Sequence, residues 1–325
     1  MSQQPLVARR LAVVPTLRCT LNCKLCCNHM NRFKHPYDIP IDKLKQDIDR
    51  LFELFDYIKW IQFVGGEIFI RDDMAEVYEY TLKYKSKFDK LILMTNATIA
   101  PRPAEIEVLK KAWEICDIGY KAVLDSDIVG LTEIQAAAIG EKAARDAGAE
   151  SITFTIFASG ERTNTVIGRP TEKIIEAGDM IMYALADEWP FVAGGNPSPK
   201  QQQLIHDLIV AEDIGIKAIT PGVKAGKVIK EIRDYFNERG LSENDLYPPI
   251  HGNGLEEAES PYPDENSTYA FEKGMGINFD VSLFGVEGVG SNRIEEGFII
   301  GEEGLITLSP LISGLRESYL KKYRK

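Results

Sequence analysis

The sequence predicts an α/β chain in two parts, an incomplete (β/α) half barrel followed by an α+β domain. In the first part, apolar β-prone segments alternate with amphipathic helical segments at a spacing of roughly 30 residues, the pattern of a parallel sheet. The stretch TIAPRPAEIE, residues 98–107, ends this pattern with two prolines before a long helical segment. We therefore place a boundary there and expect two domains, residues 1–100 and 101–325.

The first part contains three strand segments and two intervening helices. We expect strands at residues 11–17, 60–67 and 91–98, and helices at residues 41–57 and 73–88. In units of this kind the functional loops follow the C-terminal ends of the strands. The first helix has apolar residues at helical spacing, namely Leu44, Ile48, Leu51, Phe52 and Phe55.

The second part mixes helices and strands without strict alternation. Residues 246–325 indicate strands separated by Gly-rich turns, with residues 285–292 as a hairpin connection. Upstream of them we expect helices at residues 105–123, 132–147, 199–213 and 224–239, and strands at residues 151–159 and 178–186.

Composition and charge restrict the function. The chain is 44% hydrophobic and 27% charged, a globular balance, and its net charge of -11 argues against a general nucleic-acid binder. No apolar run approaches the roughly 18 residues of a membrane span, and the N-terminal stretch MSQQPLVARRLAVV lacks the pattern of a secretory signal. We expect a cytoplasmic protein with a small-molecule substrate, and neither nucleic acid nor membrane as partner.

Four of the five cysteines lie in RCTLNCKLCCNHM, residues 18–30. In a reducing compartment such a cluster more often binds metal than forms disulfides. Cys19, Cys23 and Cys26 have the spacing C-x3-C-x2-C, so their thiolates can ligate three irons of a [4Fe-4S] cluster and leave the fourth iron without a protein ligand. The alternative is a zinc site in which His29 or Cys27 supplies the fourth ligand.

This spacing resembles the signature of the radical S-adenosylmethionine (SAM) enzymes, and two later motifs support the resemblance. GGE at residues 65–67 is similar to the family motif that binds the SAM ammonium, and TNAT at residues 95–98 is similar to a strand end near that cofactor. The resemblance covers residues 10–100, three strand–helix units where the family has six. It implies a [4Fe-4S] cluster, bound SAM, and an electron donor such as flavodoxin or ferredoxin. The implied ligands are Cys19, Cys23 and Cys26 for the cluster, and Gly65, Gly66, Glu67, Thr95 and Asn96 for SAM.

The second part resembles the pita-bread family of aminopeptidase P, methionine aminopeptidase and creatinase. The resemblance implies a pita-bread fold for residues 101–325 and a homodimer through this domain. It is carried, in order, by AEIEVLKKA, VGLTE, TFTIFASG, EAGDMIMYALA, HGNGLEEAESP, KGMGINFD and RIEEGFIIGEEG.

In metallopeptidases of that family, two aspartates, a histidine and two glutamates hold two metal ions that activate water. The resemblance places His251 at the histidine and Asp280 and Glu295 at the two glutamates. Ala184 stands at the first aspartate, and Asp187 is a nominal match for the second. These positions imply a degenerate site for one divalent metal at most.

Creatinase shows that this fold also hydrolyses C–N bonds without metal. For such a reaction His251 and Glu295 are the candidate catalytic residues. Glu161, Arg162 and Asp280 are the other charged groups that the resemblance makes available to the pocket.

The sequence thus carries two incomplete enzyme signatures. We expect first a radical SAM enzyme that generates a 5'-deoxyadenosyl radical on an unknown small substrate, because all the residues of its motifs are present. The alternative is a hydrolase of C–N bonds similar to creatinase or aminopeptidase P, metal-free or with the degenerate site. The third hypothesis is a catalytically inactive mosaic scaffold.

Overall fold

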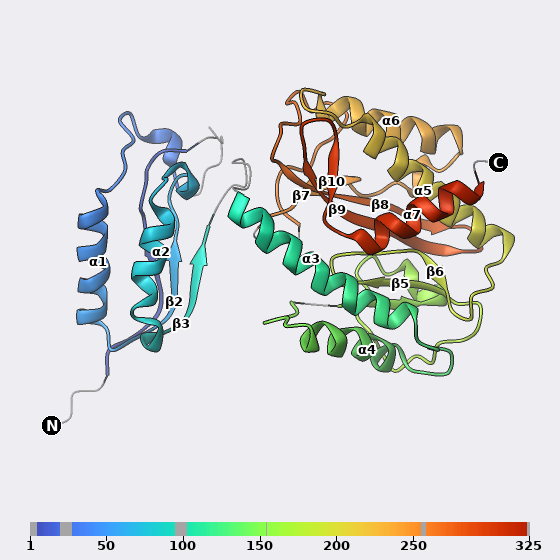
Figure 1. Cartoon of the computed structure of the whole chain (residues 1–325), viewed down its shortest axis with the longest axis horizontal. Helices are drawn as coiled ribbons and strands as arrows, with labels where there is room; N and C mark the ends of the chain where they lie inside the picture. Colours follow the sequence, from blue (N-terminus) through green and yellow to red (C-terminus); the bar gives the residue numbers. More distant parts are fainter. Residues whose placement is uncertain (1–4, 20–27, 95–102, 154, 255–257, 324–325) are drawn as a thin grey trace. The chain divides into compact units, whose positions relative to one another are not determined.

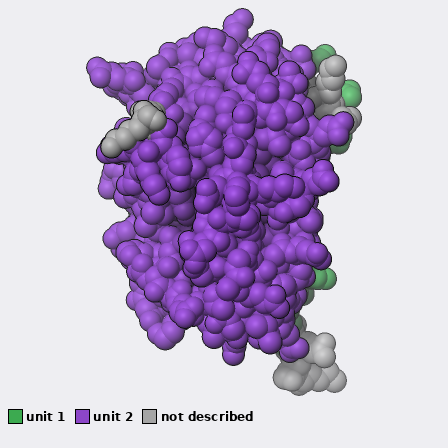
Figure 2. Space-filling view, turned by 90° about the vertical axis from the view of Figure 1, so that its right-hand side faces the viewer, with its two compact units in different colours: residues 1–99 green, residues 100–325 purple. Residues whose placement is uncertain are grey.

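The computed structural model describes residues 5–19, 28–94, 103–153, 155–254 and 258–323. The chain divides into two compact units, Met1–Ile99 and Ala100–Lys325, which are green and purple in Figure 2. We call them unit 1 and unit 2 and describe each by itself.

Unit 1 is a parallel sheet in the order β1-β2-β3, with a helix in each connection between strands (Figure 1). The α/β alternation that the sequence predicts is therefore present. The apolar face of α1, with Leu44, Ile48 and Phe52, forms the core together with Val77 of α2 and Phe63 of β2. The elements are β1 (Val7–Val13), η1 (Met30–Arg32), α1 (Ile41–Leu54), β2 (Tyr57–Phe63), η2 (Ile68–Ile70), α2 (Met74–Leu82), η3 (Lys85–Lys87) and β3 (Phe88–Leu93).

The strands of unit 1 begin and end earlier than predicted. β1 ends at Val13 because Pro15 has no N–H to donate to a ladder. β2 ends at Phe63 because the Gly65-Gly66 turn follows it. Within the described residues β1 and β3 each pair with β2 alone, so unit 1 is a three-stranded sheet, and the half barrel stays a prediction.

Unit 2 contains a three-stranded sheet, β4-β5-β6, and a four-stranded antiparallel sheet, β10-β9-β8-β7. Helix α5 packs on β8 and β9, and the apolar side chains between the helices and these strands form the larger core. The elements (Figure 1) are α3 (Pro103–Leu124), α4 (Glu133–Asp146), β4 (Ile156–Ser159), η4 (Gly160–Asn164), β5 (Met180–Ala184), β6 (Phe191–Val192), α5 (Pro199–Ala218), α6 (Ala225–Glu238), η5 (Ser242–Asn244), β7 (Ile250–Gly252), β8 (Gly276–Val286), β9 (Gly290–Ile300), β10 (Leu305–Thr307) and α7 (Pro310–Tyr323).

Local sequence signals account for two helix starts in unit 2. Thr132 caps α4 and Ser198 caps α5, and in each case the side chain of the residue three positions later, Gln135 or Gln201, returns the bond to the backbone of the cap. These reciprocal bonds are capping boxes, and they satisfy N–H groups that a helix end leaves without partners.

The chain after residue 245 is not only strands and turns, as we expected, because residues 310–323 form α7. The start of this helix depends on a residue far away in sequence. The carboxylate of Asp117 on α3 accepts hydrogen bonds from the Ser309 hydroxyl and, at 2.9 Å, from the Leu311 N–H. A cap supplied by another helix leaves no signal in the local sequence, so the prediction missed α7.

Among the described residues, no helix combines the length and the apolar character that crossing a bilayer requires.

Candidate functional site

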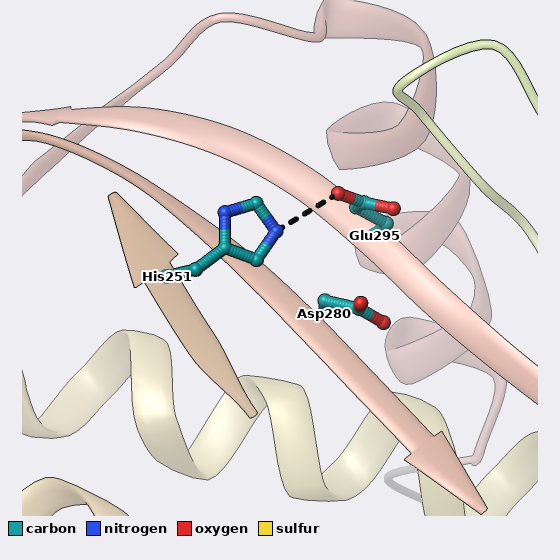
Figure 3. Close-up of side chains that lie close together, drawn as sticks. All are labelled: His251, Asp280 and Glu295. Carbon is teal, nitrogen blue, oxygen red and sulfur yellow. Dashed lines mark ion pairs between the residues drawn. The ribbon is translucent and has the colours of Figure 1, made fainter. Parts of the chain in front are cut away.

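Three buried side chains converge on one face of the four-stranded sheet (Figure 3). His251 lies on β7, Asp280 on β8 and Glu295 on β9, and each is at most 3% exposed. One ligand atom from each lies within 4.8 Å of the others. The strand pairing explains this, because Asp280 is directly opposite Glu295, and His251 is opposite Asn278, two positions from Asp280 on the same face.

Hydrogen bonds fix the orientation of these side chains. Nδ1 of His251 lies 2.9 Å from the Gly252 carbonyl oxygen, which can only accept, so Nδ1 carries a hydrogen and Nε2 faces the site. Nε2 lies 3.4 Å from Oε1 of Glu295. The Asn278 amide donates to the same Oε1 at 3.0 Å, and the Ser282 hydroxyl donates to Oδ1 of Asp280 at 2.7 Å.

Two residues that the sequence analysis did not select complete this site. Arg293, on β9, has Nη1 3.4 Å from Oδ2 of Asp280 and Nε 3.4 Å from Oε2 of Glu188. Glu188 is fully buried and forms an isolated bridge with Glu295. The resemblance pointed to its neighbour Asp187, and the long-range pairing of Glu188 with Glu295 leaves no signal in the local sequence.

Burial shifts the pKa of two acids of this site, Glu188 and Asp280. It raises the pKa of Glu188 well above its usual range, although the charge of Arg293 acts in the opposite direction. Burial likewise raises the pKa of Asp280, again opposed by Arg293. Both carboxyls are therefore harder to ionise here than in water, and a further cation at the site would favour their ionised forms.

His251 responds in the opposite way. Burial by itself lowers the pKa of this imidazole, but the hydrogen bond to Glu295 and the charges of Glu295 and Asp280 outweigh burial and raise the pKa to about 9. Without a bound metal, His251 is therefore protonated at neutral pH and forms an ion pair with Glu295.

Other candidates from the sequence lie elsewhere in unit 2. Ala184 packs with the apolar side chains of Ile156 and Phe284, so no carboxylate stands at that position. Asp187 is buried, and after burial itself the charge of Asp117 contributes most to raising its pKa. Among the pocket charges that we expected, Glu161 is exposed and Arg162 binds the carboxylate of Glu133 at 3.1 Å, so neither joins the three residues.

In unit 1 the GGE motif forms a tight structural turn. A Cβ on Gly65 would lie 2.5 Å from the Thr16 carbonyl oxygen, and one on Gly66 would lie 1.7 Å from that of Arg18. Glu67 is fully buried, and its carboxylate accepts from the Phe69 N–H at 3.0 Å and caps η2. Packing of the turn against the segment after β1 thus accounts for this motif.

The remaining predicted ligands of unit 1 are mostly outside the described residues. Cys19 is described and half-buried. Cys23, Cys26, Thr95 and Asn96 lie outside the described ranges.

Two family models match the chain. The model of metallopeptidase family M24 matches residues 107–302, and that of the Radical SAM superfamily matches residues 13–125. The first match covers more than half of the sequence, so the chain belongs to metallopeptidase family M24. Both resemblances that the motifs indicated are thereby confirmed, and the family is one of enzymes, as we expected of this chain.

Curated relatives and solved structures agree with this assignment. The Xaa-Pro dipeptidase of Pyrococcus furiosus is 27% identical over 282 residues, which cover 83% of this chain and 79% of that protein. The uncharacterized peptidase YqhT of Bacillus subtilis is 30% identical over 217 residues, which cover 63% of this chain and 61% of that protein.

The fold is shared with solved structures of the same kind. The X-Pro aminopeptidase from Thermotoga maritima has a TM-score of 0.60 at 24% identity, covering 83% of this chain and 77% of that one. The prolidase from Pyrococcus horikoshii has a TM-score of 0.61 at 24% identity, covering 81% and 77%. Unit 2 therefore has the pita-bread fold that the sequence indicated.

The expectation of a radical SAM enzyme is wrong. The relatives and structural neighbours above are peptidases. The Xaa-Pro dipeptidase of Pyrococcus furiosus and the X-Pro aminopeptidase from Thermotoga maritima each match 83% of the chain, which is more than unit 2 contains, so the likeness extends into unit 1. The GGE motif lies within the Radical SAM match, but it does not by itself establish the radical reaction, because a close-packed Gly-Gly turn also requires these residues. The expected electron donor, flavodoxin or ferredoxin, was required only by the radical reaction and loses its basis.

Proposed function

We propose that unit 2 hydrolyses a C–N bond in a small peptide, at the site formed by His251, Asp280 and Glu295. The observation that carries the proposal is the convergence of these three buried side chains from adjacent strands, in a chain of family M24. Relatives named Xaa-Pro dipeptidase support an amide bond before proline as the substrate class, in place of the unspecified small molecule expected from the sequence.

The residues present do not fit a pair of metal ions. Ala184 offers no ligand, and Asp187 lies outside the group of three, as does Glu188. They do fit a single divalent cation, because an imidazole and carboxylates suit such ions and Nε2 of His251 faces the carboxylates. The hydrogen bond from Nδ1 to the Gly252 carbonyl is of the kind that orients ligating histidines. When bound, the cation would polarise the scissile carbonyl as a Lewis acid.

The protein groups around these ligands have separate tasks. Asn278 holds Oε1 of Glu295 toward His251. Arg293 provides a fixed positive charge in a site largely shielded from water, where such a charge can stabilise the oxygen that becomes negative during amide hydrolysis. In a metal-free reaction, the protonated His251 would donate its Nε2 proton to the leaving amine.

The test is hydrolysis of Xaa-Pro dipeptides by the full chain, with added manganese and with a chelator. We expect cleavage that His251→Ala abolishes and that His206→Ala retains, because His206 lies on α5 among aromatic side chains. Stimulation by manganese supports the single-metal form, and activity with chelator supports the metal-free form. If the parent chain is folded and cleaves no dipeptide under either condition, the proposed function is contradicted.

Several finer features stay predictions. The [4Fe-4S] cluster on Cys19, Cys23 and Cys26, and SAM held through Gly65, Gly66, Glu67, Thr95 and Asn96, are supported by the Radical SAM family match over residues 13–125. The homodimer through unit 2 is supported only by the resemblance to the pita-bread family.

A further inference from the structure

Glu188 belongs to a row of three carboxylates that crosses the sheet. The backbone N–H of Glu188 donates to the Glu295 carbonyl at 3.1 Å, and the N–H of Glu295 donates to the Glu188 carbonyl at 2.9 Å. This exchange uses both backbone groups of Glu295. Asp280, which is opposite Glu295 on the neighbouring strand β8, therefore forms a non-hydrogen-bonded pair with it, the type in which the side chains are closer together. Directly opposed residues point to the same face, and the order of the row is Glu188, Glu295, Asp280.

The carboxylate of Glu188 is not satisfied by its surroundings. The side chain is fully buried, and among the described residues neither of its oxygens accepts a hydrogen bond. Its one close ionic partner in the described structure is Arg293, with 3.4 Å between Nε and Oε2. A buried carboxyl without hydrogen bonds is costly, and in native structures it calls for a specific explanation.

Arg293 holds the two ends of the row only loosely. Its distances of 3.4 Å to Glu188 and to Asp280 are longer than the roughly 2.7–2.9 Å of a charge-assisted hydrogen bond. Its one close bond is from Nη2 to the Val166 carbonyl, at 2.7 Å. The guanidinium is thus a shared counter-ion for Glu188 and Asp280, and neither acid is tied to it by a short bond.

We propose that Glu188 is a fourth ligand of this site, joining His251, Asp280 and Glu295 around one divalent cation. It supplies the carboxylate that Ala184 cannot, from a position beside Glu295 instead of on β5. In this structure Glu188 lies outside the group of three, so its carboxylate would have to leave Arg293 and turn toward the other ligands, and the cation would then replace Arg293 as its counter-ion. This inference uses the site of the proposed function, but it concerns metal binding and is tested without any peptidase assay.

Asp187 provides a matched control in the preceding position of the chain. It is as deeply buried as Glu188, and among the described residues its carboxylate oxygens likewise accept no hydrogen bond. The charge that acts on it most strongly is that of Asp117, whereas Arg293 and Glu295 act most strongly on Glu188. Glu188→Gln and Asp187→Asn each replace one buried carboxyl by an amide of the same shape. A general effect of losing a buried acid near the sheet would therefore appear in both variants.

The experiment measures manganese binding to the metal-free full chain by electron paramagnetic resonance of the unbound ion. We expect Glu188→Gln to weaken the affinity at least about tenfold, a loss of about 1.4 kcal/mol, and Asp187→Asn to change it less than about threefold. Cobalt(II) absorption in the visible region reports the ligand set, and its spectrum should change in Glu188→Gln and remain that of the parent in Asp187→Asn. Circular dichroism of each variant checks that the fold is retained.

Equal affinities for Glu188→Gln and the parent would overturn the proposal, as would equal losses in both variants. A parent chain that binds no manganese at millimolar concentration would overturn it as well. These outcomes are distinct from failure of the proposed function. If the chain binds manganese through Glu188 but cleaves no dipeptide, this inference is supported and the proposed function is contradicted. If the chain cleaves dipeptides but binds no manganese, the proposed function is supported and this inference is contradicted.

Discussion

Nε2 of His251 lies 3.4 Å from Oε1 of Glu295, and both side chains are at most 2% exposed. An ion pair this deeply buried is formed only if the imidazole is protonated, so its stability depends on pH. Because a divalent cation at the same site would compete with the proton for Nε2, the pair also links pH to metal binding.

The metal-free protein is expected to lose stability as the pH rises from about 6.5 to 9. The pKa of His251 is raised from 6.5 in the unfolded chain to about 9 in the folded one, so in this window the folded state binds more protons. A group with a raised pKa contributes fully below its unfolded pKa and loses that contribution as the pH passes its folded pKa. Thermal melting in chelator should show a fall of several degrees across this window, since about 1 kcal/mol shifts the melting temperature of a domain this size by roughly 2–4 °C.

The control for this prediction is His251→Gln, which removes the titrating group. Its melting temperature should vary less over the same pH range. An equally steep fall in the variant would show that other groups control the pH dependence.

Arg293→Gln is expected to destabilise the metal-free protein strongly. The change removes the counter-ion of Asp280 and Glu188 from a site where both acids are buried. Removing one partner of a buried ion pair costs about 3–5 kcal/mol. Urea unfolding in chelator measures the loss. Arg145→Gln is the control, because Arg145 is exposed and, among the described residues, donates to two backbone carbonyls near the end of α4.

The same variant also tests the competition between Arg293 and a metal. If the guanidinium occupies the place of a cation, saturating manganese should recover part of the stability lost in Arg293→Gln and add less to the parent. Equal stabilisation of both proteins would contradict this competition.

The sequence predicted the elements whose signals are local. The helices α1 and α6 have regular apolar spacing, and α4 and α5 begin at capping boxes, so their positions could be predicted within a few residues. Helix α7 was missed because its cap comes from Asp117 on α3. The end of β1 was misplaced although its signal is local, because the strand expected at residues 11–17 runs through Pro15, which cannot donate to a ladder.

The site shows the same division between local motif and long-range pairing. Each of His251, Asp280 and Glu295 lies within a recognisable family segment, and the resemblance selected all three. Glu188 follows Asp187, which the resemblance offered as a nominal match for the second aspartate. Only the bridge to Glu295, more than 100 positions away, shows that Glu188 faces the site.

The cysteine spacing of unit 1 leads to a prediction that can be tested by reconstitution. Anaerobic addition of iron and sulfide should yield a chain with about four irons and absorption in the violet region. The cluster should be lost when Cys19, Cys23 or Cys26 is changed to alanine, and kept in Cys27→Ala, which is the matched control. Stoichiometric zinc in place of iron, or loss of the metal only in Cys27→Ala, would contradict this ligand assignment.

Gly66→Ala is expected to destabilise unit 1 while leaving unit 2 folded. A Cβ at this position would lie 1.7 Å from the Arg18 carbonyl oxygen, and the Gly66 and Glu67 N–H groups donate at 3.1 and 2.8 Å to the carbonyls of Thr16 and Arg18. Relief of that clash requires the turn to move away and to give up both bonds, and the buried Glu67 would then lose the backbone position from which it caps η2. Hydrogen exchange followed by mass spectrometry should show lost protection in residues 7–93, with unit 2 unaffected. Gly314→Ala is the control, because a Cβ there meets nothing within 4 Å and alanine favours the helix. If Gly66→Ala has the same hydrogen-exchange protection as the parent, the segment after β1 can shift at little cost in free energy. Close packing would then not explain the GGE motif.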